Sequence, residues 1–416
     1  MLRLLARLKR GFTLAFTMTA GVLSFTAPEP LMSAIEQSRS NSTSQRVIGL
    51  ESIRSFKNAS SGTFAKNTGA LNTFISATLG SKSKSLSHEG DLVALINKDC
   101  IDVEIIGDQG GQKAFSICKR GATFINARFS PDGNNLATIY SYRLGDGSIS
   151  VKLTIWEPST GQYPGNTKDS PDFVETMTLA VTNPEKLWFD DLSFSFNGKL
   201  LASNFGAVVR MWDIGSKREH QFLPPVNPPG IEPEEIELSR DGKFLAVHFH
   251  LRRGSANYDA LHIWNLSTGQ QTTLYHEVYS DIAFSLDSGL LAFSTKALKG
   301  EIDEHTEAVV MEVGSWKVTD SIRPPDSYMG ISALGFGVDG ILFIGGNKTL
   351  GSYCLKGRCF IAHHPHPSPF FAPSRLKGEI STIEVSDTGL LLTNGEDGEA
   401  RVWRIIKSFR GECSCH

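Results

Sequence analysis

One short turn, flanked on both sides by short apolar runs, recurs seven times along the chain. Its copies read SHEG, SPDG, SFNG, SRDG, SLDSG, GVDG and SDTG, and they begin at Ser87, Ser130, Ser195, Ser239, Ser285, Gly337 and Ser386. Asp, Asn or Gly stands where a tight turn needs a positive φ or a side chain that bonds its own backbone. Recurrence at intervals of about 43 to 65 residues indicates a repeat architecture, with one structural unit per copy.

Each turn except the first is followed, either 16–17 or 25–26 residues after its first residue, by a large side chain. These landmark residues are Trp156, Trp212, Trp264, Met311, Tyr353 and Trp403. The first copy has Glu104 at this place instead. Further tight turns follow several landmarks, so each copy is predicted to contain four short strands joined by hairpins. One such unit cannot bury its apolar face, so neighbouring units must stack, and closure into a ring removes exposed sheet edges.

These residues resemble the repeats of the WD40 family. The best match is NGEDGEARVW, which ends at Trp403, and Met211-Trp212-Asp213 carries a literal Trp-Asp pair. Thr393, Asp397 and Trp403 stand as in the family's hydrogen-bonded strand network. The family's Gly-His pair is absent here, and exported propellers of the TolB-like and YVTN-like kinds share the turn-then-strand pattern. The resemblance implies an all-β fold, a seven-bladed β-propeller of four-stranded antiparallel blades.

The resemblance covers about residues 70–406, and the last copy ends near Lys407. The last copy therefore has too few residues to form its own fourth, outermost strand. Propellers of this family often complete that blade with an N-terminal strand, and RVIGLESI at Arg46–Ile53 is the candidate. A C-terminal strand over Ser408–Cys413 is the alternative.

The residues before the repeats have the composition of a targeting segment. Residues 1–27 hold four basic residues and no acidic one, followed by the moderately apolar run Gly11–Ala27. This layout predicts a signal peptide or a membrane anchor, and hence an exported protein in the periplasm, outside the cell or attached to a membrane. A transit peptide to an organelle is the alternative. Residues 28–45 are a Ser-rich linker, which leaves residues 46–416 for the propeller.

The chain has six cysteines, and an even number beside an export signal favours disulfide bonds. Cys354 and Cys359 flank Lys356-Gly357. A two-residue turn there places the cysteines opposite each other at a non-hydrogen-bonded position, which fits a disulfide. Cys100 and Cys118 flank a second predicted hairpin and form the other candidate pair. Reduced thiols in a reducing compartment are the alternative.

Three copies have extra residues between their second and third strands. These connections are Tyr142–Ser150, His250–Ala260 and Lys296–Glu307. The resemblance implies that they project from the same face as the loops between blades, where together they would form a rim. Candidate binding residues on this rim are Arg143, Arg252, Arg253, Tyr258 and Asp259. Arginine and tyrosine are frequent anchors of interfaces, so the rim predicts a protein or peptide partner.

Signals of chemistry are weak by comparison. His363, His364 and His366 are candidate metal ligands, although an exposed loop without a ligand accounts for them equally simply. The sequence contains no GxSxG, GxxxxGK[ST] or HExxH motif. No catalytic residue and no cofactor are therefore assigned.

A net charge of −3 gives no electrostatic case for binding nucleic acid. The main hypothesis is a non-enzymatic, monomeric WD40-like propeller that acts as a protein–protein interaction scaffold outside the cytoplasm. A hydrolase or lyase with its site at the central channel is the alternative, and a metal or redox carrier is a third possibility. An enzyme requires polar side chains with perturbed protonation at the channel, whereas a scaffold requires arginine or aromatic anchors on its rim.

Overall fold

The computed structural model divides the chain into two units, Met1–Arg46 with His416 and Val47–Cys415. It describes residues 17–19, 22–24, 49–57, 84–87, 92–97, 99–106, 112–131, 133, 135–158, 173–182, 191–204, 208–222, 231–251, 259–276, 278–296, 306–324, 330–346, 349–365, 380–395 and 399–406.

The first unit contains one small hairpin among its described residues. Its strands are β1 (Thr17–Thr19) and β2 (Val22–Ser24), which pair antiparallel with Met18 opposite Leu23. They lie inside the apolar run of residues 11–27. No helix in the described residues is long and apolar enough to cross a membrane.

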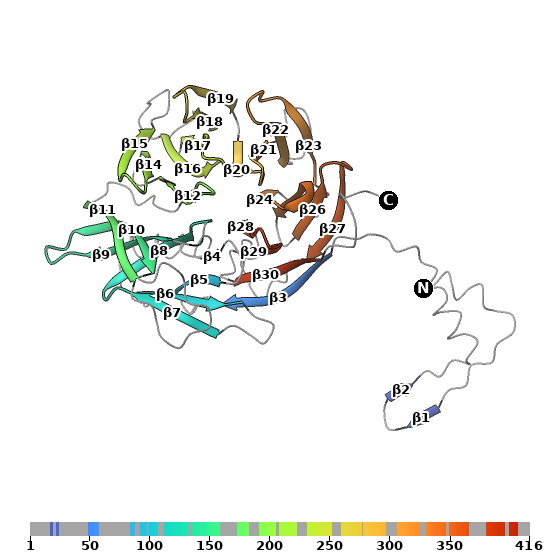
Figure 1. Ribbon diagram of the computed structural model, residues 1–416. Helices are drawn as coiled ribbons and strands as arrows, with labels where there is room; N and C mark the ends of the chain where they lie inside the picture. The colour runs from blue at the N-terminus through green and yellow to red at the C-terminus, as the bar shows by residue number, and fades with distance from the viewer. Residues whose placement is uncertain are drawn as a thin grey trace. The chain divides into compact units, whose positions relative to one another are not determined.

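The second unit consists of seven four-stranded antiparallel sheets, arranged as the blades of a propeller (Figure 1). Blade 1 contains β4 (Lys84–Leu86), β5 (Leu92–Asn97), β6 (Cys100–Ile105) and β7 (Gln112–Cys118). Blade 2 contains β8 (Ala122–Phe129), β9 (Leu136–Arg143), β10 (Ile149–Pro158) and β11 (Phe173–Thr182). Blade 3 contains β12 (Leu192–Phe194), β13 (Leu200–Ser203), β14 (Val209–Asp213) and β15 (Arg218–Phe222). Blade 4 contains β16 (Ile231–Leu238), β17 (Phe244–Leu251), β18 (Asp259–Asn265) and β19 (Gln271–His276).

The remaining blades follow the same order. Blade 5 contains β20 (Val278–Phe284), β21 (Leu290–Lys296), β22 (Thr306–Glu312) and β23 (Val318–Ile322). Blade 6 contains β24 (Ile331–Phe336), the 3₁₀ helix η3 (Val338–Gly340), β25 (Ile341–Gly346), β26 (Thr349–Cys354) and β27 (Cys359–Pro365). Blade 7 contains β28 (Ile380–Val385), β29 (Leu390–Gly395), β30 (Glu399–Ile406) and β3 (Gly49–Lys57). The predicted all-β, seven-bladed propeller is therefore confirmed.

Antiparallel order gives the propeller two distinct faces. The first-to-second turns and, in blades 3–6, the third-to-fourth turns lie on one face, which we call the turn face. The strand ends that are joined by the second-to-third connections and by the links between blades lie on the opposite face, the loop face. The first strand of each blade is innermost and lines a central channel.

The recurring serine explains why the turns repeat in sequence. In blade 4 the Ser239 hydroxyl oxygen accepts a hydrogen bond from the backbone N–H of Phe244 at 2.9 Å, and the hydroxyl donates to Asp241 Oδ1 at 2.7 Å. Gly242 adopts a φ of +71°, which costs glycine little. The same serine-to-backbone bond closes the turn at Ser285, where Leu290 N–H donates at 2.8 Å. One hydroxyl therefore satisfies backbone groups that a tight hairpin would otherwise leave unpaired.

The landmark residues join neighbouring blades. The described residues form seven buried apolar clusters, each shared by two adjacent blades, and six of them contain one landmark. Trp156, for example, is 4% exposed between blades 1 and 2. The cluster between blades 7 and 1 has no landmark and only five buried members, Leu86, Val93, Leu392, Ala400 and Val402. We call this junction the seam.

The N-terminal strand β3 occupies the outer position of blade 7, beside β30 (Figure 1). Its register runs from Gly49 opposite Ile406 to Lys57 opposite Glu399. The predicted N-terminal closure is confirmed, although the strand ends four residues later than the predicted Ile53. It continues because β30 itself extends back to Glu399 and offers partners that far. Residues 408–413, the alternative closing strand, lie outside the described residues.

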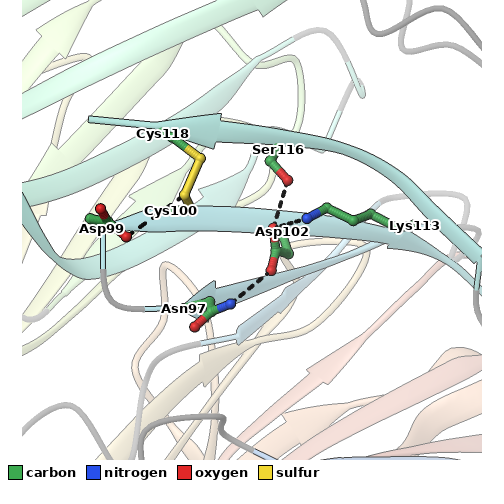
Figure 2. The surroundings of a disulfide bond; sticks show 7 residues. All are labelled: Asn97, Asp99, Cys100, Asp102, Lys113, Ser116 and Cys118. Atoms are coloured by element: carbon green, nitrogen blue, oxygen red, sulfur yellow. Dashed lines mark hydrogen bonds and ion pairs between the residues drawn. A yellow bond between two sulfur atoms is a disulfide. The ribbon is translucent and has the colours of Figure 1, made fainter. Parts of the chain in front are cut away.

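The predicted disulfide between Cys100 and Cys118 is present, with its Cα atoms 4.1 Å apart (Figure 2). Lys119 N–H donates to the Asp99 carbonyl at 2.9 Å, so these two residues form a hydrogen-bonded pair. The adjacent pair, Cys100 and Cys118, is then a non-hydrogen-bonded one, at which side chains on neighbouring strands are closest. The turn expected around Asp108 lies outside the described residues.

A polar cluster lies beside this disulfide on the outer part of blade 1. The Asp102 carboxylate accepts hydrogen bonds from Ser116 at 2.6 Å and Asn97 at 3.1 Å and pairs with Lys113 at 2.7 Å (Figure 2). Burial acts to raise the pKa of Asp102, but the bonds from Lys113, Ser116 and Asn97 outweigh it and lower the pKa. Asp102 therefore stays ionised and links three strands.

The hairpin of the other cysteine pair differs from the sequence prediction. Cys354 and Cys359 are partners in the register of β26 and β27, and both are disulfide-bonded. The expected two-residue turn Lys356-Gly357 is wrong, because the turn spans Leu355–Arg358 and its positive φ of 54° falls on Arg358. The cysteines therefore stand directly at the ends of a four-residue turn. Among the described residues no cysteine is free.

Candidate functional site

The central channel encloses a cavity of about 180 Å³. Residues from the first strands of all seven blades line it. Its charged lining residues are Arg128, Asp191, Glu235, Glu237, Arg240, Asp281 and Glu384. Five carboxyl groups thus face two guanidinium groups in a confined space.

One ion pair crosses the interior of the channel. Arg128 Nη1 on β8 lies 3.0 Å from Glu384 Oε1 on β28, so it joins blades 2 and 7, which are not neighbours in the ring. The other oxygen of Glu384 accepts hydrogen bonds from Leu86 N–H at 2.9 Å and the Ser85 hydroxyl at 3.2 Å, both in blade 1. Glu384 therefore connects three blades, including both sides of the seam.

Nearby carboxylates stabilise the positive charge of the Arg128 guanidinium. Burial acts to lower the pKa of its guanidinium, but the carboxylates of Glu384, Glu237, Asp191 and Asp281 outweigh this and raise the pKa. Arg128 is therefore a permanent cation inside the channel, one-third exposed to the channel space.

Carboxylate and hydroxyl groups of the inner strands also bond the backbone of the next blade. Asp191 accepts from Ile236 N–H at 2.7 Å, which joins blade 3 to blade 4. Asp281, at a φ of +41°, accepts from Leu334 N–H at 2.5 Å, which joins blade 5 to blade 6. These bonds satisfy inner-strand backbone groups that lack a partner within their own blade.

Glu237 has the most perturbed protonation in the channel. Burial is the largest cause and raises its pKa to about 8, while Arg128 acts to lower it and Asp191 acts to raise it. The Ser193 hydroxyl of blade 3 donates to Glu237 Oε2 at 3.1 Å. At neutral pH Glu237 is therefore mostly protonated.

Replacement of Glu237 by Gln is expected to change how stability depends on pH. Between pH of about 4.5 and about 8, Glu237 is protonated in the folded protein and ionised in the unfolded chain. Folding takes up a proton in this window, so the free energy of unfolding falls as the pH rises. Glu237→Gln removes this fall in unfolding free energy. Relative to the unchanged protein, the variant should therefore have a higher melting temperature, and the difference should be larger at pH 9 than at pH 5. Thermal unfolding of both proteins across this range checks it, and identical pH profiles would contradict it.

A second cross-channel ion pair lies on the turn face. Arg240, in the first turn of blade 4, pairs with Asp387, in the first turn of blade 7. The guanidinium also lies 4.3 Å from the ring centroid of Phe196, in the corresponding turn of blade 3, a cation–π geometry. The channel mouth on this face is therefore bridged by a side chain.

The rim residues predicted from the sequence are only partly placed. Arg143 ends β9 and is exposed, and Asp259 begins β18, both at the loop face but on blades 2 and 4. Arg252, Arg253 and Tyr258 lie outside the described residues. The described residues thus bring no two of the predicted rim residues together.

The first of the three enlarged connections is shorter than expected. β9 continues to Arg143 and β10 starts at Ile149, so only residues 144–148 form a turn. Asp146 Oδ1 accepts hydrogen bonds from the backbone N–H and the hydroxyl of Ser148, which makes this turn compact. The extra residues of blade 2 lengthen its strands because the strand pairing continues through them. The other two connections, residues 252–258 and 297–305, lie outside the described residues.

Asp259 is engaged by His248 and His250 of β17. His250 Nδ1 contacts the Asp259 carboxylate directly, and His248 Nε2 lies 3.6 Å from it. Burial acts to raise the pKa of Asp259, but the interactions with His248 and His250 outweigh it and lower the pKa. The sequence signal for this contact is the His-x-His spacing of His248 and His250, followed by an acidic residue at the start of the next strand.

Of the candidate metal ligands, His363 and His364 lie on β27, and His366 lies outside the described residues. Among the described residues no group of three or more potential ligands could hold a metal ion.

The predicted strand network of blade 7 is present in part. Trp403 Nε1 donates to the Thr393 hydroxyl oxygen at 2.9 Å, while Asp397 lies outside the described residues. Blade 2 has the same bond between Trp156 and Thr138, at 2.8 Å. The longer strands β9 and β10 separate these two residues further in sequence, which concealed the second case.

The channel residues themselves were missed by the sequence analysis, although a positional signal exists. The second and fourth residues before each turn point inward along the first strand, because side chains alternate along a strand. The second position before the turn holds Arg128, Glu237 and Glu384. The fourth position holds Asp191, Glu235 and Asp281.

Comparisons with known proteins give a fold and no family. No family model matches the sequence, and no curated protein matches it. In contrast, 1066 chains of solved structures match the fold. One is a chain in a crystal structure of the mitotic checkpoint complex, with a TM-score of 0.57 and 13% identity over 95% of this chain and 99% of that chain. At this identity the likeness supports the propeller fold alone.

Proposed function

We propose that this chain is a non-enzymatic WD40-like propeller that acts as a protein–protein interaction scaffold, binding its partner on the loop face. The observation that carries the proposal is the use of the channel carboxyl groups. Asp191, Glu237, Asp281 and Glu384 each accept a hydrogen bond from an adjacent blade. Their interactions serve to hold the ring, and recognition is left to the outer surface. The structural neighbour belongs to a complex, which is consistent with a protein partner.

One observation favours a second candidate, a propeller hydrolase or lyase. Glu237, with its pKa raised to about 8, is a protonated carboxyl group beside the cation Arg128, and such pairs occur in acid–base catalysis. Glu237→Gln separates the two proposals, because a scaffold variant would still capture its partner while an enzyme variant would lose turnover.

The scaffold proposal is tested on the loop face. Affinity purification from the native compartment identifies a partner, and binding of the purified pair is then measured. Replacing Arg252 and Arg253 by Ala should weaken binding at least tenfold, about 1.4 kcal/mol, and leave the melting temperature unchanged. The matched control is Lys217→Ala/Arg218→Ala, two exposed cations at a turn on the opposite face. Equal binding by the Arg252/Arg253 variant and the control would remove these arginines from the interface.

An oxidising compartment outside the cytoplasm is part of the same proposal. The disulfide between Cys100 and Cys118 supports it, because such bonds persist in exported proteins. Intact-mass measurement of alkylated protein from its native source, with and without reductant, tests it, and full alkylation without reductant would contradict it.

A further inference from the structure

A second cavity, of about 270 Å³, lies at the junction of blades 4 and 5. Its lining residues are Phe244, Ile263, Asn265, Gln270, Thr272, Gly314 and Trp316. They come from the turn ends of β17, β18, β19 and the last turn of blade 5, so the cavity opens at the turn face. It shares no lining residue with the channel. We call it the junction pocket.

Trp316 stands in this pocket at a backbone position suited to glycine. The last turns of blades 4 and 5 have the same hydrogen bonds, with Gly269 N–H donating to Asn265 and Trp316 N–H donating to Glu312. Gly269 has a φ of +71° and Trp316 a φ of +55°. Bulky side chains rarely adopt this conformation, and strained residues of this kind cluster at functional sites. Trp316 therefore adopts a strained backbone conformation, whereas Gly269 adopts the same conformation in blade 4 without strain.

The indole ring and Phe244 form an aromatic corner. Their ring centroids lie 5.5 Å apart at an interplanar angle of 89°, an edge-to-face arrangement. Both side chains are half-buried, so part of their apolar surface is open to the pocket.

Ile263 and Gly314 also line the pocket, and the polar groups beside them have few partners in the protein. Asn265 Oδ1 accepts hydrogen bonds from Ser267 N–H at 3.0 Å and Thr268 N–H at 3.1 Å, which leaves its NH₂ group as a donor. Within the described chain, the Gln270 amide, the Thr272 hydroxyl and the Trp316 indole N–H form no hydrogen bond with another residue. The pocket therefore offers four polar groups and carries no charged lining residue.

We propose that the junction pocket binds a pyranose ring of a neutral saccharide. A pyranose has an apolar C–H face, which packs on aromatic rings, and a rim of hydroxyl groups, which pair with amide, hydroxyl and indole groups. The absence of charge among the lining residues disfavours phosphate, carboxylate and ammonium ligands, whose desolvation would go uncompensated. The inference is independent of the scaffold proposal, because it concerns the opposite face.

The test uses the full chain and three neutral disaccharides, maltose, cellobiose and diacetylchitobiose. Saturation-transfer NMR should show at least one of them bound at millimolar concentration, with the strongest transfer to ring C–H protons. Trp316→Gly keeps the turn, since Gly269 forms the same turn in blade 4, and should abolish the transfer. Gln270→Ala, at an exposed site, should weaken binding about tenfold through loss of its hydrogen bonds.

Lys317→Ala is the matched control, because Lys317 is exposed beside Trp316 but does not line the pocket. Binding by the control and loss in both pocket variants supports the inference. It is overturned if none of the disaccharides binds, or if binding survives in Trp316→Gly. Trp316 would then serve only to pack blade 5 against Phe244.

Discussion

A chain that begins at Asn58, and so lacks β3, is expected to melt roughly 4 °C or more below the chain that begins at Val47. β3 pairs with β30 along its whole length, from Gly49 to Lys57. Its removal leaves the backbone groups on one edge of β30 without partners, at a net cost of roughly 3 kcal/mol or more. The loss also reaches the seam, because Ala400 and Val402 of β30 supply two of its five buried residues.

Differential scanning calorimetry of the two chains measures this effect. The chain that starts at Val47 is the control, since it also lacks residues 1–46 but keeps β3. Adding a synthetic peptide of residues 47–57 to the shorter chain should restore part of the lost melting temperature. Equal melting temperatures for the two chains would show that β3 does not close the ring.

Replacing Arg128 by Ala is expected to cost roughly 2–4 kcal/mol of unfolding free energy, somewhat less than a fully buried pair because water in the channel screens the charges. The change leaves Glu384 without its cation and removes the positive charge that balances Asp191 and Asp281. Denaturant unfolding at neutral pH measures it.

Lys243→Ala is the matched control for this experiment. Lys243 forms an ion pair of similar length with Asp241, at 3.0 Å, but its side chain is 63% exposed. Its loss should cost less than about 1 kcal/mol. The double variant Arg128→Met/Glu384→Met should be more stable than Arg128→Ala, because it removes the unpaired carboxylate as well. Equal costs for Arg128→Ala and Lys243→Ala would rule out the cross-channel pair as a support of the ring.

The seven blades could be predicted because their signals are local. Each serine closes its own hairpin, and each landmark packs at the junction with the preceding blade, so both recur at readable intervals. The pair between Arg128 and Glu384 could not be predicted in the same way. It joins residues far apart in the sequence, and only closure of the ring brings them together.

Two errors have a common physical origin. The turn at Cys354–Cys359 and the connection Tyr142–Ser150 were both assigned from residue types rather than from backbone pairing. Gly357 suggested the site of positive φ, but four-residue turns in this protein place it at their last residue, here Arg358. Between Tyr142 and Ser150 strand pairing continues almost to the end, which leaves a turn of five residues. The rim residues Arg252, Arg253 and Tyr258 remain predictions.

The pairing of β3 with β30 also fixes the order of events during biosynthesis. Among the strands of the propeller, the ribosome releases β3 first and its partner β30 last, so the ring cannot close before β30 has been synthesised. Contacts between chain ends form slowly, and an open ring exposes a strand edge in the meantime. A nascent chain therefore needs protection of that edge, and any proteolytic cleavage that leaves the ring closed must fall before Gly49.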